Sequence, residues 1–130
     1  MIESSGIRSS VSGEAGLFKG ESVNNHFSEI SVKHLKDRLE KGEDILLLDV
    51  REPYEYRIAN LKGFLVPLGQ LAGKLDEIDR TKDIVVYCHH GNRSAVAVQF
   101  LQNLGFEKVS NLVGGIDRWS EEIDSTIPRY

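Results

Sequence analysis

The sequence contains a single cysteine, Cys88, among its 130 residues, and this scarcity excludes two classes of small protein. One thiol cannot form an internal disulfide, so a secreted disulfide scaffold is excluded. A zinc site built from four cysteines is excluded by the same count. The sequence therefore raises the question of what one cysteine does in a domain that stays reduced.

Long apolar runs and an excess of basic charge are also lacking. The longest apolar run, at residues 84–88, has about five residues, whereas a membrane-spanning helix needs roughly 20. The 16 basic residues are outnumbered by 20 acidic ones, which gives a formal net charge of −4. Nucleic-acid-binding proteins instead carry a basic stripe or face. We therefore expect a cytoplasmic protein of about one domain, with neither a membrane nor a nucleic acid as its partner.

The first 28 residues differ in composition from the rest of the chain. They contain seven serines and four glycines but few large apolar side chains, so burial cannot offset the entropy lost on ordering them. They also lack the apolar core of a secretory signal. We predict a flexible tail over residues 1–28, or the remnant of a linker to a preceding domain, and one folded domain over residues 29–130.

Strand-like and helix-like segments alternate along the predicted domain. Short, nearly continuous apolar runs indicate strands of a parallel sheet, and apolar residues at helical spacing indicate helices between them. The expected strands cover residues 29–30, 45–50, 64–66, 83–87 and 108–112, and the expected helices cover residues 32–41, 53–56, 68–78, 94–104 and 116–123. The alternation predicts an α/β fold, in which a five-stranded, mainly parallel sheet has helices on both faces.

Cys88 follows one of the buried strands and precedes a helix by about six residues. In open α/β sheets, ligands bind at the carboxyl ends of the strands. Gly91 and Asn92 tolerate left-handed backbone geometry, so the loop can curl and direct several N–H groups at one point. With the helix dipole and the charge of Arg93, these groups should favour a nucleophilic thiolate. A lone strand cysteine is more often a buried apolar side chain, but the loop context favours catalysis.

Two further pairs of polar residues are expected at the same carboxyl ends of the strands, where ligands bind in open α/β sheets. His89 and His90 follow Cys88, but three adjacent side chains in a tight loop cannot converge on one ion. We therefore expect no metal and place the two imidazoles at the rim of the pocket. Asp49 and Arg51 lie at the carboxyl end of the other buried strand, and we expect Asp49 to support the loop by hydrogen bonds. Arg51 fits such a supporting role and a solvated turn equally well.

Several motifs follow one another along the chain: Asp49-Val50-Arg51-Glu52-Pro53-x-Glu55-Tyr56, then Gly63, then Cys88-x-x-Gly91-x-Arg93-Ser94, then Gly114-Gly115-Ile116-x-x-Trp119. Their order resembles that of the rhodanese (sulfurtransferase) domain over residues 28–130. The resemblance implies a rhodanese-like three-layer fold without a cofactor. It also implies that Cys88 accepts a sulfane sulfur as a persulfide, within an active-site loop formed by His89, His90, Gly91, Asn92, Arg93 and Ser94. The sulfur would pass from a donor such as thiosulfate to cyanide, a thiol or a protein by double displacement.

The loop length and the C-terminal residues narrow this resemblance. Phosphatases of the same fold have five residues between their cysteine and arginine, whereas four separate Cys88 from Arg93, which predicts a tighter cradle that suits one sulfur atom. Residues 115–130 resemble small stand-alone rhodaneses and the terminal domain of adenylyltransferases that activate sulfur carriers, so such a system is an expected partner. The alternative is a non-catalytic rhodanese module that regulates or binds proteins. Such modules usually lack the cysteine.

Overall fold

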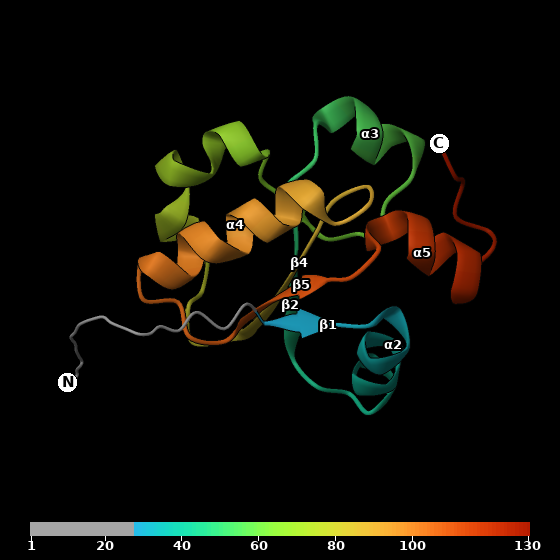
Figure 1. The fold of residues 1–130 in the computed structure, drawn as a ribbon, viewed down its shortest axis with the longest axis horizontal. Helices are drawn as coiled ribbons and strands as arrows, with labels where there is room; N and C mark the ends of the chain where they lie inside the picture. The colour runs from blue at the N-terminus through green and yellow to red at the C-terminus, as the bar shows by residue number, and fades with distance from the viewer. Residues whose placement is uncertain (1–27) are drawn as a thin grey trace.

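The computed structural model describes residues 28–130, which form a five-stranded sheet with helices packed around it (Figure 1). The predicted tail lies outside the described residues, apart from Ser28. The strands are β1 (Glu29–Ile30), β2 (Ile45–Asp49), β3 (Phe64–Leu65), β4 (Asp83–Tyr87) and β5 (Val109–Leu112). Their order is β1-β5-β4-β2-β3, and every neighbouring pair is parallel. The expected α/β fold is thus confirmed, with a sheet that is parallel throughout.

Helices cover both faces of this sheet, so its central strand β4 (Asp83–Tyr87) is buried on both sides. The helices are α2 (Val32–Glu40), α3 (Pro53–Ile58), α4 (Asn92–Asn103) and α5 (Gly115–Glu122), together with the 3₁₀ helices η1 (Leu68–Gly73) and η2 (Leu75–Glu77). Alternate residues of a strand point to opposite faces. Accordingly, Ile84 and Val86 of β4 pack in the core beneath α4 and η1, whereas Val85 and Tyr87 pack in the core beneath α2 and α5. The three-layer arrangement follows from these two cores.

The helix predicted over residues 68–78 is wrong in type. The structure has the two short 3₁₀ helices there, with a break at Lys74. The apolar side chains are three or four residues apart, which also suits the tighter 3₁₀ turn. Gly69 and Gly73 weaken an α-helix in this segment, and only two apolar side chains, Leu71 and Ile78, are fully buried.

The sheet register brings the two informative segments of the sequence together. Asp49 pairs with Tyr87, the last residues of β2 and β4, and the Val50 N–H donates to the Tyr87 carbonyl at 3.1 Å. The residues that follow these strands therefore lie at the same edge of the sheet, beside Cys88. Among the described residues, no helix combines the length and the apolar character that crossing a membrane requires.

Candidate active site

The loop after β4 curls around the sulfur atom of Cys88. Gly91 has a φ of +110°, so the left-handed geometry predicted for it is confirmed, whereas Asn92 is already the first residue of α4. The curl directs two backbone donors at Sγ, the N–H of Gly91 at 3.1 Å and that of Ser94 at 3.4 Å. Cys88 is only 1% exposed. The sulfur therefore lies in a cradle at the N-terminus of α4, where the helix dipole also favours negative charge.

Asn111 of β5 fixes this loop through two side-chain hydrogen bonds. The Ser94 hydroxyl lies 3.3 Å from Sγ and hydrogen-bonds the Asn111 side-chain oxygen. The Asn111 amide donates to the Gly91 carbonyl at 3.2 Å. Asn111 is 4% exposed, so both of its bonds are protected from water. Sequence reasoning missed this residue, whose one signal is a polar side chain inside an apolar strand.

The first residues of α5 fix the same loop through backbone hydrogen bonds. The N–H of Ile116 donates to the Cys88 carbonyl at 2.9 Å, and that of Asp117 donates to the His89 carbonyl at 3.0 Å. Gly115 has a φ of +62°, and a Cβ atom there would lie 2.4 Å from the His89 oxygen and 2.5 Å from the Cys88 oxygen. Only glycine allows this close approach of the two backbones.

Arg93 binds Glu55 of α3. Its guanidinium donates to both carboxylate oxygens, at 2.6 and 2.8 Å. These hydrogen bonds are the main reason why the pKa of Glu55 is lowered to about 2. No hydrogen bond joins Arg93 to Cys88 in the described part of the chain. Arg93 therefore ties the start of α4 to α3, and much of its charge is compensated by Glu55.

Asp49 and Arg51 form a fully buried ion pair beneath α3. Nε and Nη2 of Arg51 donate to the two Asp49 oxygens at 2.9 and 2.7 Å, and both side chains are 0% exposed. Nη2 also donates to the carbonyl of Ala59, where α3 ends, at 2.8 Å. Of the two interpretations of Arg51, the structure favours support of the loop over a solvated turn. Asp49 supports the same loop through its hydrogen bond from the Arg51 N–H at 3.0 Å.

His89 lies between the rings of His90 and Tyr130, a residue that sequence reasoning did not single out. The placement of the two imidazoles at the rim of a pocket stays a prediction. The His89 ring stacks on Tyr130 with centroids 3.9 Å apart, and it meets the His90 ring at 3.8 Å. The Tyr130 hydroxyl donates to Glu55 and accepts from Nη1 of Arg51, both at 2.8 Å. Burial, and then the neighbouring His90, lower the pKa of His89. Its Nε2 atom is buried and has no hydrogen-bond partner among the described residues.

Asp117 brings a third metal-ligating group to the two histidines. One ligand atom each from His89, His90 and Asp117 lies within 4.8 Å of the others. The Asp117 carboxylate is, however, already paired with Arg129, at 2.9 and 3.1 Å. An ion would have to displace that guanidinium, so the expectation of a metal-free site stays our prediction.

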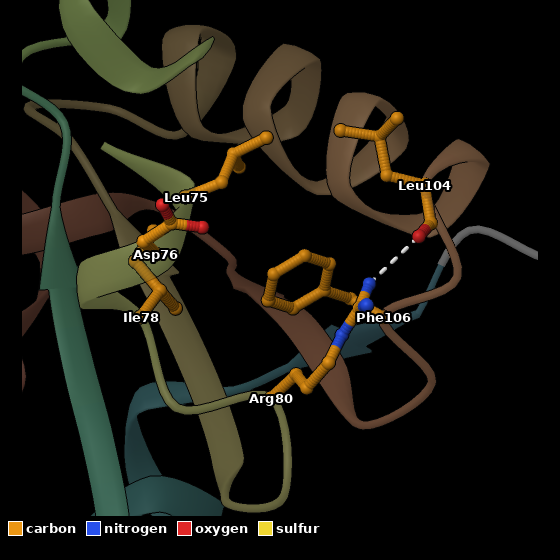
Figure 2. Close-up of a pocket in the computed structure, with 6 residues that line it drawn as sticks. All are labelled: Leu75, Asp76, Ile78, Arg80, Leu104 and Phe106. Carbon is orange, nitrogen blue, oxygen red and sulfur yellow. Dashed lines mark hydrogen bonds between the residues drawn. The ribbon is translucent and has the colours of Figure 1, made fainter. Parts of the chain in front are cut away.

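A separate hollow lies at the other end of α4 (Figure 2). It is lined by Leu75, Asp76, Ile78, Arg80, Leu104 and Phe106. Arg80 closes one side of it, with its guanidinium 4.3 Å from the Phe106 ring and hydrogen-bonded to the Leu104 carbonyl at 2.7 Å. The 12-residue α4 is about 18 Å long at 1.5 Å per residue. This hollow is therefore distinct from the Cys88 site.

Comparison with known families and curated proteins gives consistent matches. The model of the rhodanese-like domain matches residues 31–122. A protein of Allochromatium vinosum named as a sulfurtransferase is 36% identical over 94 residues, which cover 72% of this chain and 88% of that protein. The adenylyltransferase and sulfurtransferase MOCS3 of Arabidopsis thaliana is 32% identical over 120 residues, covering 79% of this chain but 26% of that protein. The chain thus spans about a quarter of the MOCS3 relative.

Solved structures show the same fold. The rhodanese-related protein of Thermoplasma volcanium superposes with a TM-score of 0.68 at 35% sequence identity. The match covers 75% of this chain and 94% of that one. The three-layer fold implied by the sequence is therefore confirmed.

Proposed function

This chain belongs to the rhodanese-like domain family, and we propose that it is a sulfurtransferase in which Cys88 carries the sulfur as a persulfide. The observation that carries the proposal is the cradle around Sγ, where the N–H groups of Gly91 and Ser94 converge on one buried sulfur atom. Donors fixed in this way stabilise a negatively charged sulfur without having to reorganise. The sulfurtransferase name of the Allochromatium relative supports the same reaction class.

The proposed reaction has two displacements. The Cys88 thiolate attacks the outer sulfur of a donor such as thiosulfate, the sulfur–sulfur bond of the donor breaks, and sulfite leaves with its electron pair. An acceptor such as cyanide or a thiol then attacks the outer sulfur of the persulfide. The sulfur–sulfur bond to Cys88 breaks, and the thiolate is regenerated. Because these 130 residues contain no second cysteine, an accepting thiol must come from outside them.

We further propose that the physiological acceptor belongs to a sulfur-carrier or adenylyltransferase system. The names of two relatives support this assignment, the MOCS3 protein and a Bacillus subtilis relative named as a sulfur carrier protein, YrkF. The latter is 36% identical over 93 residues, half of its own length. The buried sulfur of Cys88 requires an acceptor with a slender reactive end, such as a thiol on a flexible segment.

The decisive experiment compares the protein with its Cys88→Ser variant. After incubation with thiosulfate, we expect the mass of the unaltered protein to increase by one sulfur atom, and cyanide to remove that atom as thiocyanate. The serine variant keeps a side chain of similar size, so it should fold and unfold like the parent but gain no sulfur. Sulfur loading that persisted in the variant would refute the role of Cys88.

The same preparations distinguish the alternative functions. An aryl phosphate that was hydrolysed by the parent but not by Cys88→Ser would support a phosphatase instead. A parent protein that took up no sulfur from any sulfane donor would support a non-catalytic regulatory or binding module. Thermal unfolding of both proteins checks that the comparison is made between folded chains.

A further inference from the structure

The Tyr130 side chain reaches back over the Cys88 loop. The C-terminus lies beside α3, far along the chain from Glu55 but next to it in space (Figure 1). The Tyr130 ring is nearly parallel to the His89 ring, with an angle of 6° between their planes and 3.9 Å between their centroids. His89 is the residue that directly follows Cys88. The tyrosine therefore contacts the active-site loop next to its reactive residue.

Two hydrogen bonds fix the far end of this ring. The phenol oxygen donates to Glu55 and accepts from Arg51, at 2.8 Å in each case. Both partners are themselves immobilised, since Glu55 is paired with Arg93 and Arg51 is paired with the buried Asp49. The ring therefore cannot swing away from His89 without breaking both bonds.

His89 lies between this fixed ring and His90, so its own side chain is also held in place. Cys88 is 1% exposed, and a reagent must pass the side chains of the loop to reach its sulfur. His89 directly follows Cys88, so its imidazole is one of the loop side chains that lie next to that residue. Burial of the unpartnered His89 Nε2 shows how closely the side chains around it pack.

We propose that Tyr130 is a positioning residue that clamps His89 beside the approach to Cys88 and so limits the size of the sulfur acceptor. The proposal rests on the proposed function, because it concerns the acceptor step. Small acceptors reach the sulfur past the clamped imidazole. Bulky acceptors require His89 to move, which breaks the stack with Tyr130.

The test uses the reactivity of the single cysteine. Rates of alkylation are measured with iodoacetamide, which is small, and with N-(1-pyrenyl)maleimide, which is bulky. Tyr130→Ala should raise the ratio of the bulky to the small rate by about two- to tenfold, the factor that corresponds to one stacked aromatic contact. Tyr130→Phe keeps the stack and loses the phenol bonds, so its ratio should lie between those of the parent and the alanine variant.

The control is Tyr54→Ala, because Tyr54 lies on α3 next to Glu55 but is 57% exposed. Its ratio should equal that of the parent. His89→Ala should raise the ratio by itself, and Tyr130→Ala should then add nothing, since Tyr130 acts through His89. Additive effects of the two substitutions, or an unchanged ratio in Tyr130→Ala, would overturn the proposal. Thermal unfolding confirms that each variant is folded at the assay temperature.

Kinetics with two acceptors extend the test to sulfur transfer. In Tyr130→Ala, the KM for glutathione should fall relative to the KM for cyanide, by a factor similar to that seen in alkylation. A purely structural role would lower the amount of active protein and leave both KM values unchanged. If the parent formed no persulfide, the proposed function would fail, whereas the alkylation ratios would still decide the role of Tyr130.

Discussion

Glu55 is the residue through which α3, the Cys88 loop and the C-terminal segment are connected, and its charge is open to a direct test. Its side chain is 4% exposed and accepts two hydrogen bonds from Arg93, one from the Tyr130 hydroxyl and one from the Glu52 N–H. The substitution Glu55→Gln keeps the size of the side chain and removes its charge. It replaces one acceptor oxygen by an NH₂ group. Because NH₂ is itself a donor, it cannot accept the hydrogen bonds that this oxygen accepted.

The magnitude follows from the pKa of this carboxyl. It falls from 4.5 in an ordinary glutamate to about 2, mainly because of the hydrogen bonds from Arg93. At about 1.4 kcal/mol for each pH unit, this difference corresponds to about 3 kcal/mol of stability at neutral pH. The Arg93 side chain is 37% exposed, so water screens part of the interaction. We therefore expect Glu55→Gln to lower the free energy of unfolding by about 2 kcal/mol at pH 7.

The pH dependence gives the sign of the effect. Because the folded pKa lies below the unfolded one, the charge of Glu55 stabilises the fold above about pH 4.5, and this contribution is lost as the pH falls toward 2. The free energies of unfolding in urea of the parent and of Glu55→Gln should thus differ most at pH 7. At pH 3 this difference should be less than about half as large. Glu107→Gln serves as the control, because Glu107 is exposed and forms no ion pair in the described part of the chain. A stability difference that stayed constant between the two pH values would refute the reasoning.

Three further substitutions test the supports of the loop. In chemical denaturation, Gly115→Ala should lower the free energy of unfolding by more than about 2 kcal/mol, because the new Cβ meets two carbonyl oxygens at a positive φ. The control is Gly69→Ala, which should be nearly neutral because no atom lies within 4 Å of the new Cβ. Asn111→Ala leaves a buried hydroxyl and a buried carbonyl without their partner, so it should cost about 1–3 kcal/mol in urea unfolding and slow the loading of sulfur onto the cysteine. Arg51→Lys replaces the two parallel hydrogen bonds to Asp49 by a single point charge at a buried site. Thermal unfolding should show that the free energy of unfolding falls by about 3 kcal/mol. An unchanged melting curve would mean that the pair does not support the fold.

The residues that act locally could be predicted from the sequence. The Cys88 loop was identified because a strand, a curl at Gly91 and a helix start follow one another within a few residues, and backbone rules connect such neighbours. The class of the fold followed from the alternation of apolar runs in the same way. By contrast, the spacing of Leu68, Leu71, Leu75 and Ile78 fits an α-helix and a 3₁₀ helix alike, so periodicity alone gave the wrong helix type for that segment.

The residues that act over long distances could not be predicted. Asn111, Glu55 and Tyr130 reach the loop from β5, from α3 and from the segment after α5, so their role depends on which parts of the chain become neighbours. The same holds for Arg93. The sequence predicted that its charge acts on the sulfur, whereas in the tertiary structure its guanidinium is paired with Glu55.

The sequence by itself thus predicted which residue is the candidate nucleophile, and it predicted the curled backbone around it, because that backbone depends on residues within a few positions of each other. Only the tertiary structure decided which side chains surround the cradle and how the sulfur is reached. A strand order in which β4 lies between β2 and β5 brings Asp49 and Asn111 to the two sides of Cys88. The physical reason is that hydrogen bonds and ion pairs act over a few ångströms in space, whatever the separation along the chain.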